Sequence, residues 1–395
     1  MTSMNESERI AQLFMVAAYS NKGDSHEKKI KELIEQNHIG GVMFLQGSPY
    51  RQARITNDFQ KASKIPLLIA IDAEWGIDMR LDSSLRFPWQ MTLGAIKDPD
   101  LIYQMGEEVA RQCKLLGIHM NFAPVVDVNS NPKNPIINNR SFGEDPKRVA
   151  VLGASYMRGM QDNKILACAK HFPGHGDTEE DSHKTLPIIR HSRYRLSQTE
   201  LVPFKRLIQE GVSSIMVAHL EIPSLDTTKN LAATLSSKVV NKLLKDELNF
   251  NGLVITDALN MKGVSDYYSS GELELKALLA GNDILLFPED VPKAILEIKR
   301  AVKEKKISQE YIDQKCKKIL QAKYWVGLNK YQPISLNEIT DNIITPQAEA
   351  LNRELISSSV TLLQNYENLI PLKRLDTLKI ASVSIGESGD AFQDM

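Results

Sequence analysis

The stretch Ile165-Leu166-Ala167-Cys168-Ala169 is a short apolar run, and the charged Lys170 follows it directly. A run of this length that is apolar on both faces is typical of a strand in a parallel sheet covered on both sides by helices. Seven similar runs occur along the chain, and segments with helical periodicity separate them. The eight predicted strands are residues 13–19, 41–46, 67–71, 118–122, 165–169, 213–217, 253–256 and 284–287.

Eight short strands that alternate with helices predict an α/β fold, namely a (β/α)8 barrel of the TIM type. A doubly wound open sheet is the alternative arrangement. The chain has no GxGxxG or GKS/T phosphate loop, which weakens the nucleotide-binding form of that alternative. Within the barrel, Ser197-Gln198-Thr199-Glu200 predicts a capping box at the start of a helix.

The pattern changes after the eighth predicted strand and its helices. We expect the barrel to occupy residues 1–330 and a linker to occupy residues 331–354. Two new β-rich runs follow at 359–363 and 379–385, and two strands alone cannot bury a core. We therefore expect a second α/β domain to start near residue 355 and to be cut off at Met395.

Composition excludes some classes of partner. The 395 residues include 48 basic and 49 acidic side chains, so no long-range field favours nucleic acid or an anionic membrane. No apolar stretch approaches the roughly 20 residues of a membrane span. The N-terminus has no signal pattern, which predicts a cytoplasmic protein as written, or an exported one if a leader was removed. The three cysteines are widely spaced and read as buried thiols, and the oligomeric state is left open.

Polar side chains follow five successive predicted strands. In a (β/α)8 barrel the active site lies at the carboxyl ends of the strands, so these side chains are expected to converge on one pocket. In chain order they are Asp72, Asn121, Asp127, Arg140, Lys170, His171, His219 and Asp257.

The segment 170–183 (KHFPGHGDTEEDSH) contains three histidines and four acids. A metal site from His171, His175, Asp177 or His183 is one interpretation, but the Pro-Gly pair within the segment opposes the helix that such spacing needs. Turn capping is a second interpretation, and it suits Asp177. We therefore predict no metal site and no cofactor.

Catalysis is the third interpretation. Asp181 and His183 are one residue apart, so the carboxylate can orient the imidazole as a proton shuttle. Asp257 ends the seventh strand, opposite this segment in the predicted mouth. A carboxylate nucleophile with a separate acid/base is what a retaining glycosidase needs.

Several segments together resemble glycoside hydrolase family 3, in its β-N-acetylglucosaminidase branch and its multi-domain variety. They are residues 139–146 (NRSFGEDP), 170–183, 216–226 (MVAHLEIPSLD), 256–261 (TDALNM), 280–283 (AGND) and 360–372 (VTLLQNYENLIPL). The resemblance covers residue 8 to the end. It implies a barrel followed by an α/β sandwich domain, and the removal of terminal β-linked N-acetylglucosamine-type sugars.

The resemblance also implies a role for each matching residue. Asp257 stands where the family has its nucleophile, and Asp181 with His183 matches the acid/base dyad of this branch. The expected sugar-binding residues are Asp72, Arg80, Arg140, Lys170 and His171.

One departure concerns Glu74-Trp75-Gly76-Ile77, where simple members of the branch read Glu-Gly-Gly-Arg. Trp75 is expected near the pocket, where it either stacks on a sugar or shields the site. The alternatives left open are a β-glucosidase or β-xylosidase of the same family, a phosphorylase, a metal-dependent hydrolase and a non-catalytic sugar-binding protein.

Overall fold

The computed structural model describes residues 4–179, 185–337, 339–373, 376–377 and 379. Eight parallel strands form one sheet in the order β7-β6-β5-β4-β3-β2-β1-β8. Their bounds are β1 Phe14–Ala18, β2 Gly41–Phe44, β3 Leu68–Ile71, β4 Met120–Asn121, β5 Leu166–Phe172, β6 Ser214–Val217, β7 Leu253–Thr256 and β8 Leu285–Leu286.

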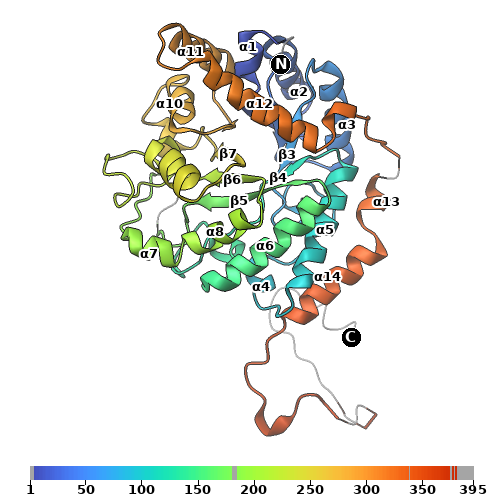
Figure 1. Cartoon of the computed structure of the whole chain (residues 1–395). Helices are drawn as coiled ribbons and strands as arrows, with labels where there is room; N and C mark the ends of the chain where they lie inside the picture. The colour runs from blue at the N-terminus through green and yellow to red at the C-terminus, as the bar shows by residue number, and fades with distance from the viewer. Residues whose placement is uncertain (1–3, 180–184, 338, 374–375, 378, 380–395) are drawn as a thin grey trace. The chain divides into compact units, whose positions relative to one another are not determined.

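The two ends of this sheet meet just before β8. Ile255 of β7 forms a parallel bridge with Ile284, and the amide of Thr256 donates to the Ile284 carbonyl at 3.1 Å. The sheet thus closes into a barrel, and helices surround it (Figure 1). The predicted (β/α)8 barrel is confirmed. Seven of the predicted strands each contain an observed one, whereas β5 continues to Phe172, beyond the predicted end at Ala169.

The helices lie before the first strand, between the strands and after the last of them. The longer ones are α2 Asp24–Glu32, α3 Pro49–Ala62, α5 Pro99–Leu115, α6 Pro146–Asp162, α8 Leu201–Gln209, α10 Glu272–Ala280, α11 Val291–Lys303, α12 Gln309–Trp325 and α14 Pro346–Ser359. The shorter ones are α1 Glu6–Ala11, α4 Gln90–Leu93, α7 Arg193–Gln198, α9 Lys262–Ser265 and α13 Ile339–Ile343. A π-helical segment, Lys238–Glu247, connects β6 to β7.

Helices α5 and α6 begin in the same way, and they pack tightly against each other. Each has an Asp at its N-cap followed by Pro, which fits the first helical turn because Pro lacks the amide hydrogen that would be unpaired there. At their contact, a Cβ on Gly159 would lie 2.2 Å from the Tyr103 carbonyl oxygen. The close approach fixes α6 and places the buried Tyr156 hydroxyl 2.8 Å from the carbonyl of Ala73, just beyond β3.

Two local predictions are wrong. Ser197 does not cap a helix, because α7 has already begun at Arg193 with Ser192 as its N-cap, and the Ser197 hydroxyl donates to the Tyr194 carbonyl. No strand occurs at 359–363, because α14 continues to Ser359 and the described residues there offer no neighbouring strand for pairing. The run 379–385 lies almost entirely outside the described residues.

The predicted linker contains helix α13 and the first part of helix α14, and these two helices contact the barrel helices α3, α4 and α5. Residues Met1–Ser359 form one compact unit, and residues Val360–Met395 form a separate one. In the second unit, Asn365 accepts from the Ile370 amide at 2.9 Å and donates to the Ile370 carbonyl at 2.8 Å. The predicted start of a second domain at residue 355 stays a prediction.

Candidate active site

A pocket of about 440 Å³ opens at the carboxyl ends of the strands. Six of the predicted site residues line it together: Asp72, Arg80, Arg140, Lys170, His171 and Asp257. The two other predicted catalytic residues, Asp181 and His183, lie outside the described residues. Apolar side chains complete the wall, among them Met43, Leu45, Phe122, Met216 and Leu286.

Lys170 occupies the centre of an ion-pair network on one side of this pocket. Its Nζ lies 2.7 Å from Asp72 Oδ1 and 2.8 Å from Glu74 Oε1. Arg80 pairs with the other oxygen of Asp72. Arg140 holds Glu74 with two hydrogen bonds, from Nη2 to Oε1 at 2.7 Å and from Nε to Oε2 at 2.9 Å. Each of the three cations therefore faces a carboxylate in a fixed geometry.

The ion pairs keep both carboxyl groups charged despite their burial. Burial by itself raises the pKa of Glu74, but Arg140 and Lys170 outweigh it and lower that pKa to about 2. Burial opposes ionisation of Asp72 as well, and Lys170 and Arg80 bring its pKa well below the usual range. Burial lowers the pKa of Lys170, yet Asp72 and Glu74 raise it overall. This side of the pocket is therefore fully ionised at neutral pH.

The backbone between the two carboxylates is fixed by a buried side chain. Asn121, at the end of β4, accepts from the Ala73 amide at 2.9 Å and donates to the Ala73 carbonyl at 3.1 Å. Because the Asn121 amide pairs with both groups of one residue, it fixes the directions in which Asp72 and Glu74 leave the chain. Asn121 is thus a supporting residue, although it stands at a strand end like the pocket residues.

Asp127 organises the end of β5. Its carboxylate is fully buried, and it accepts from His171 Nδ1 at 2.7 Å and from the His175 amide at 2.7 Å. Burial raises the Asp127 pKa, but the two histidines lower it overall. Because Nδ1 donates to this carboxylate, Nε2 of His171 is directed away from Asp127 and lies 3.4 Å from Arg140 Nη2.

Asp257 follows β7 and faces the pocket from another side. Its amide donates to the Val217 carbonyl at 3.0 Å, and its Oδ1 accepts from the Ala258 amide at 2.8 Å. Burial raises the pKa of Asp257, but His219 and His171 lower it overall, so the group is a carboxylate at neutral pH. His219 is itself buried, and its Nε2 donates to the Ala258 carbonyl at 3.0 Å.

Among the described residues, no Lys or Arg lies within ion-pair distance of Asp257, unlike Asp72 and Glu74. A carboxylate without a cationic partner keeps an oxygen lone pair available for attack on an electrophile. The pocket therefore has a charge-paired side and, apart from it, one carboxylate that is ionised but not ion-paired.

The chain enters the segment that carries Asp181 and His183 through a tightly held turn. A Cβ on Gly176 would lie 1.8 Å from the Val128 carbonyl oxygen, so only glycine fits there. Burial lowers the pKa of His175, next to it, to about 4. Further on, His191 Nε2 lies 2.5 Å from Asp177 Oδ2, and this pair joins the chain before residues 180–184 to the chain after them.

Sequence reasoning placed some residues less well. Trp75 is not among the residues that line the pocket, and its ring packs on Trp89 with centroids 5.8 Å apart. Asp127 and His219 were expected at the pocket; neither lines it, although each contacts a residue that does. Glu74 was not expected there, and it contacts Lys170 of the pocket lining. Glu74 follows Asp72 by two residues, a spacing that gave no sign of its pairing with Arg140.

Within the described residues, no group of three or more His, Cys, Asp or Glu side chains is arranged to hold a metal ion. In the same part of the chain, no helix combines the length and apolar character that crossing a bilayer requires.

A closed barrel with ionisable groups gathered at the carboxyl ends of its strands has the site architecture of a (β/α)8-barrel enzyme. Residues 6–322 match the family described as glycosyl hydrolase family 3 N-terminal domain. The chain belongs to this family, which confirms the resemblance found in the sequence.

Two relatives are similar over most of the chain. Beta-hexosaminidase A of Pseudoalteromonas piscicida is 33% identical over 378 residues, which cover 87% of this chain and 62% of the relative. The solved structure of a family 3 β-N-acetylglucosaminidase from Paenibacillus sp. str. FPU-7 is 35% identical, with a TM-score of 0.85 over 92% of this chain and 70% of that one. This chain therefore spans less than two thirds of the curated relative.

A third similar structure carries a different activity in its description. It is a β-glucoside phosphorylase, 25% identical, with a TM-score of 0.86 over 94% of this chain and 68% of that chain.

Proposed function

We propose that this chain contains the catalytic barrel of a retaining, exo-acting glycoside hydrolase that removes terminal β-linked N-acetylglucosamine-type sugars. The observation that carries the proposal is the joint lining of one pocket by the paired set Asp72, Arg80, Arg140 and Lys170 and by the carboxylate of Asp257. The names of the β-hexosaminidase and β-N-acetylglucosaminidase relatives support the choice of sugar.

The charge-paired side binds and orients the sugar. Charged groups form stronger hydrogen bonds than neutral ones, and hydroxyl groups of a sugar both donate and accept. The carboxylate of Asp72 and the guanidinium groups of Arg80 and Arg140 thus offer both kinds of partner at fixed positions. A volume of about 440 Å³ suits one sugar ring with its substituents, which supports cleavage from a chain end.

The reaction then proceeds in two displacements. An oxygen of Asp257 forms a bond to the anomeric carbon, and the bond to the leaving-group oxygen breaks as that oxygen takes a proton from the His183 imidazole. In the second step, water gives a proton to His183 and attacks the same carbon, which frees Asp257 and retains the configuration. Asp181 would fix the tautomer of His183 and stabilise its protonated form.

Phosphorolysis is the second candidate, and the description of the phosphorylase relative favours it. A neutral histidine does not repel an incoming phosphate, whereas a second carboxylate would. In that reaction, phosphate replaces water in the second displacement and the product is a sugar 1-phosphate. The same residues would act, so the acceptor alone distinguishes the two reactions.

The chain after the barrel belongs to the proposal too. We assign residues 331–354 to a connecting segment and residues from 355 onward to the start of a second α/β domain. Support comes from the resemblance of residues 360–372 to the family's second domain and from the separate compact unit that begins at Val360.

Hydrolysis of 4-nitrophenyl N-acetyl-β-D-glucosaminide, measured beside the matching β-glucoside, tests the proposal. We expect a strong preference for the N-acetyl sugar, and free N-acetylglucosamine as product with or without phosphate. A sugar 1-phosphate as the main product would move the assignment to a phosphorylase. Preference for the glucoside would contradict the choice of sugar, and binding of sugar without turnover would contradict catalysis.

The acid/base role of His183 has its own measurement. His183→Ala is expected to reduce the rate much more for alkyl glycosides than for 4-nitrophenyl glycosides, because only poor leaving groups need a proton. Equal losses on both substrates would exclude His183 as the acid.

A further inference from the structure

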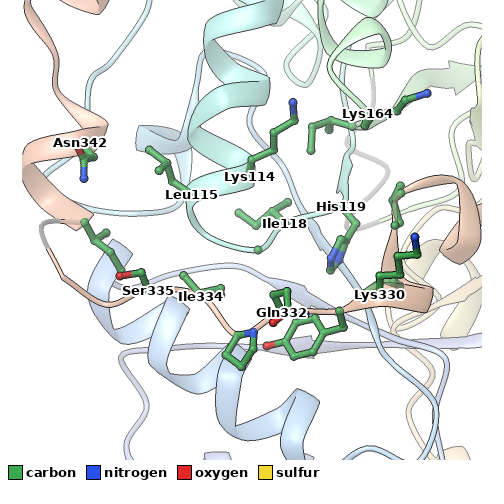
Figure 2. A pocket seen from close by; sticks show the side chains of 18 of the residues that line it. Lys114, Leu115, Ile118, His119, Lys164, Lys330, Gln332, Ile334, Ser335 and Asn342 are labelled. Carbon is green, nitrogen blue, oxygen red and sulfur yellow. The ribbon is translucent and has the colours of Figure 1, made fainter.

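A second pocket, of about 670 Å³, lies at the other end of the barrel from the candidate active site. It is lined by residues just before β4 and just before β5, by the last turn of α5, and by described residues between Val326 and Asn342. Because parallel strands all begin at one end of a barrel, this pocket belongs to the amino-terminal end, whereas the active-site residues stand at the carboxyl end. Figure 2 shows its side chains.

The outer wall of this pocket is fixed to the barrel. Asn57 of α3 accepts from the Ile334 amide at 2.8 Å and from the Tyr331 hydroxyl at 3.0 Å, and it donates to the Ile334 carbonyl at 2.9 Å. Further along, Arg111 of α5 donates to the Asn342 carbonyl at 2.7 Å. The segment is thus held on both sides of the pocket, and the cavity has a defined shape.

His119 presents a permanent hydrogen-bond donor to this pocket. Its Nδ1 accepts from the Ile69 amide at 3.1 Å, so the proton of the neutral ring is on Nε2. Burial, helped by the positive charge of Lys323, lowers the His119 pKa to about 3, which keeps the ring neutral at physiological pH. Among the described residues, no hydrogen-bond acceptor for Nε2 is found. In Figure 2 the ring extends from the chain before β4 toward the segment that carries Gln332.

The charges around the pocket have one sign. Its described lining includes Lys114, Lys164 and Lys330 and no Asp or Glu. None of these lysines forms an ion pair with a carboxylate of the described residues, and Lys164 instead lies over the Trp325 ring at 4.7 Å. The local excess of positive charge contrasts with a net charge of -1 for the whole chain.

We propose that this pocket binds the phosphate group of a small molecule. Phosphate oxygens accept hydrogen bonds and carry the charge that lysine ammonium groups attract. In the proposed complex, His119 Nε2 donates to one phosphate oxygen and the lysines at the rim neutralise the charge. The ligand is either inorganic phosphate or a phosphorylated sugar, and the remaining volume of the pocket accommodates a sugar ring. This site does not depend on the activity proposed for the mouth of the barrel.

A structural role for the lysines is the alternative. Lys114 lies in the last turn of α5, where a cation stabilises the helix end. Lys303 stands in the last turn of α11 and does not line the pocket, so it is a matched control. A helix-end role predicts the same small effect on stability for both residues and no effect of phosphate.

Calorimetric titration of the full chain with inorganic phosphate, glucose 6-phosphate and glucose, at constant ionic strength, tests the proposal. We expect a Kd of about 1 mM or tighter for at least one phosphate compound, no binding of glucose here, and weaker binding as KCl is raised. Lys114→Ala combined with Lys330→Ala should weaken binding at least about tenfold, while Lys303→Ala leaves it unchanged. Both replaced lysines are exposed, so the double variant is expected to fold.

Tighter binding of glucose 6-phosphate than of phosphate would identify a phosphorylated sugar as the ligand, and equal affinities would identify phosphate itself. His119→Ala should weaken binding as well, with the melting temperature as a check on its fold. Absence of binding for both phosphate compounds would overturn the proposal. Binding that is the same in the double-lysine variant would also overturn it, because the ion would then lie elsewhere, for example in the mouth of the barrel.

Discussion

The two ends of the barrel use lysine and arginine in opposite ways. At the carboxyl end, Lys170, Arg80 and Arg140 each contact a buried or partly buried carboxylate. At the amino-terminal end, Lys114 and Lys330 have no carboxylate partner among the described residues. Paired charges produce strong local dipoles and little net field, which suits a neutral ligand rich in hydroxyl groups. Unpaired charges of one sign produce a field that attracts an anion.

Replacement of the Asp257 carboxylate, in the pocket at the carboxyl end of the barrel, should have the largest effect, which is on kcat. Asp257→Asn removes the nucleophile while it keeps the size and the hydrogen bond from the Ala258 amide, so kcat is expected to fall on the order of 10³-fold or more. This fall in kcat is measured by steady-state hydrolysis of the 4-nitrophenyl substrate. Asp246→Asn, at an exposed position, is the control. Phosphate binding at the other end should be unchanged, and a wild-type rate would remove Asp257 from the mechanism.

A second comparison concerns stability. Lys170→Met leaves Asp72 and Glu74 without their shared cation, and breaking a buried ion pair costs about 3–5 kcal/mol of unfolding free energy. Lys114→Ala removes an exposed lysine and should change that free energy by less than about 0.5 kcal/mol. Urea unfolding measures both. Similar losses at the two positions would mean that the two ends do not differ in charge pairing.

The sequence predicted the barrel because each strand is an apolar run that ends at a polar residue or a turn. The positions of Asp72, Lys170 and Asp257 at the pocket were predictable for the same reason, since Asp72 and Asp257 directly follow β3 and β7 and Lys170 follows the apolar run of β5. The pairing of Glu74 with Arg140 joins residues 66 positions apart, and nothing local to either residue indicates it.

The pocket at the amino-terminal end of the barrel could not be predicted from the sequence, for a related reason. Its lysines lie on α5, after α6 and after α12, in positions where exposed lysines are ordinary. What distinguishes them is that none forms an ion pair with a carboxylate of the described residues, and no sequence pattern records this. The failed strand at 359–363 teaches the same lesson, because β-rich residues form a strand only where a partner strand is present.

Part of the loss of folding stability at low pH is expected to come from the ion pairs at the carboxyl end of the barrel. The pKa of Glu74 is about 2 in the folded protein, where Arg140 and Lys170 outweigh burial, and about 4.3 in the unfolded chain. The unfolded state therefore binds more protons between these values. The contribution of Glu74 to stability is complete above about pH 4.5 and is lost as the pH falls toward 2, at up to about 1.4 kcal/mol per pH unit. Glu74→Gln should flatten this part of the stability profile, and an unchanged slope would show that Glu74 is not ion-paired in solution.

A further effect is expected in the alkaline range, at the amino-terminal end of the barrel. Lys323 is buried, its Nζ donates to Gln12 Oε1 at 2.7 Å, and burial lowers its pKa to about 7. The unfolded chain holds this proton up to about pH 10.4, so stability should rise between pH 7 and 10, by at most about 1.4 kcal/mol per pH unit. Lys323→Met should remove that rise and add stability at pH 7. It replaces a buried amine, which has no carboxylate partner in the described part of the chain, with an apolar side chain of similar length.

Unfolding free energies of the wild type and Lys323→Met at pH 7 and pH 9.5 test this, with the exposed Lys303→Met as control. The same variant should raise the pKa of His119, because the positive charge of Lys323 helps to lower it. That pKa is measurable by NMR titration of the imidazole. A stability profile that does not change with pH in the wild type would mean that Lys323 has a charged partner in solution, and the positive excess at this end would then be smaller than the structure indicates.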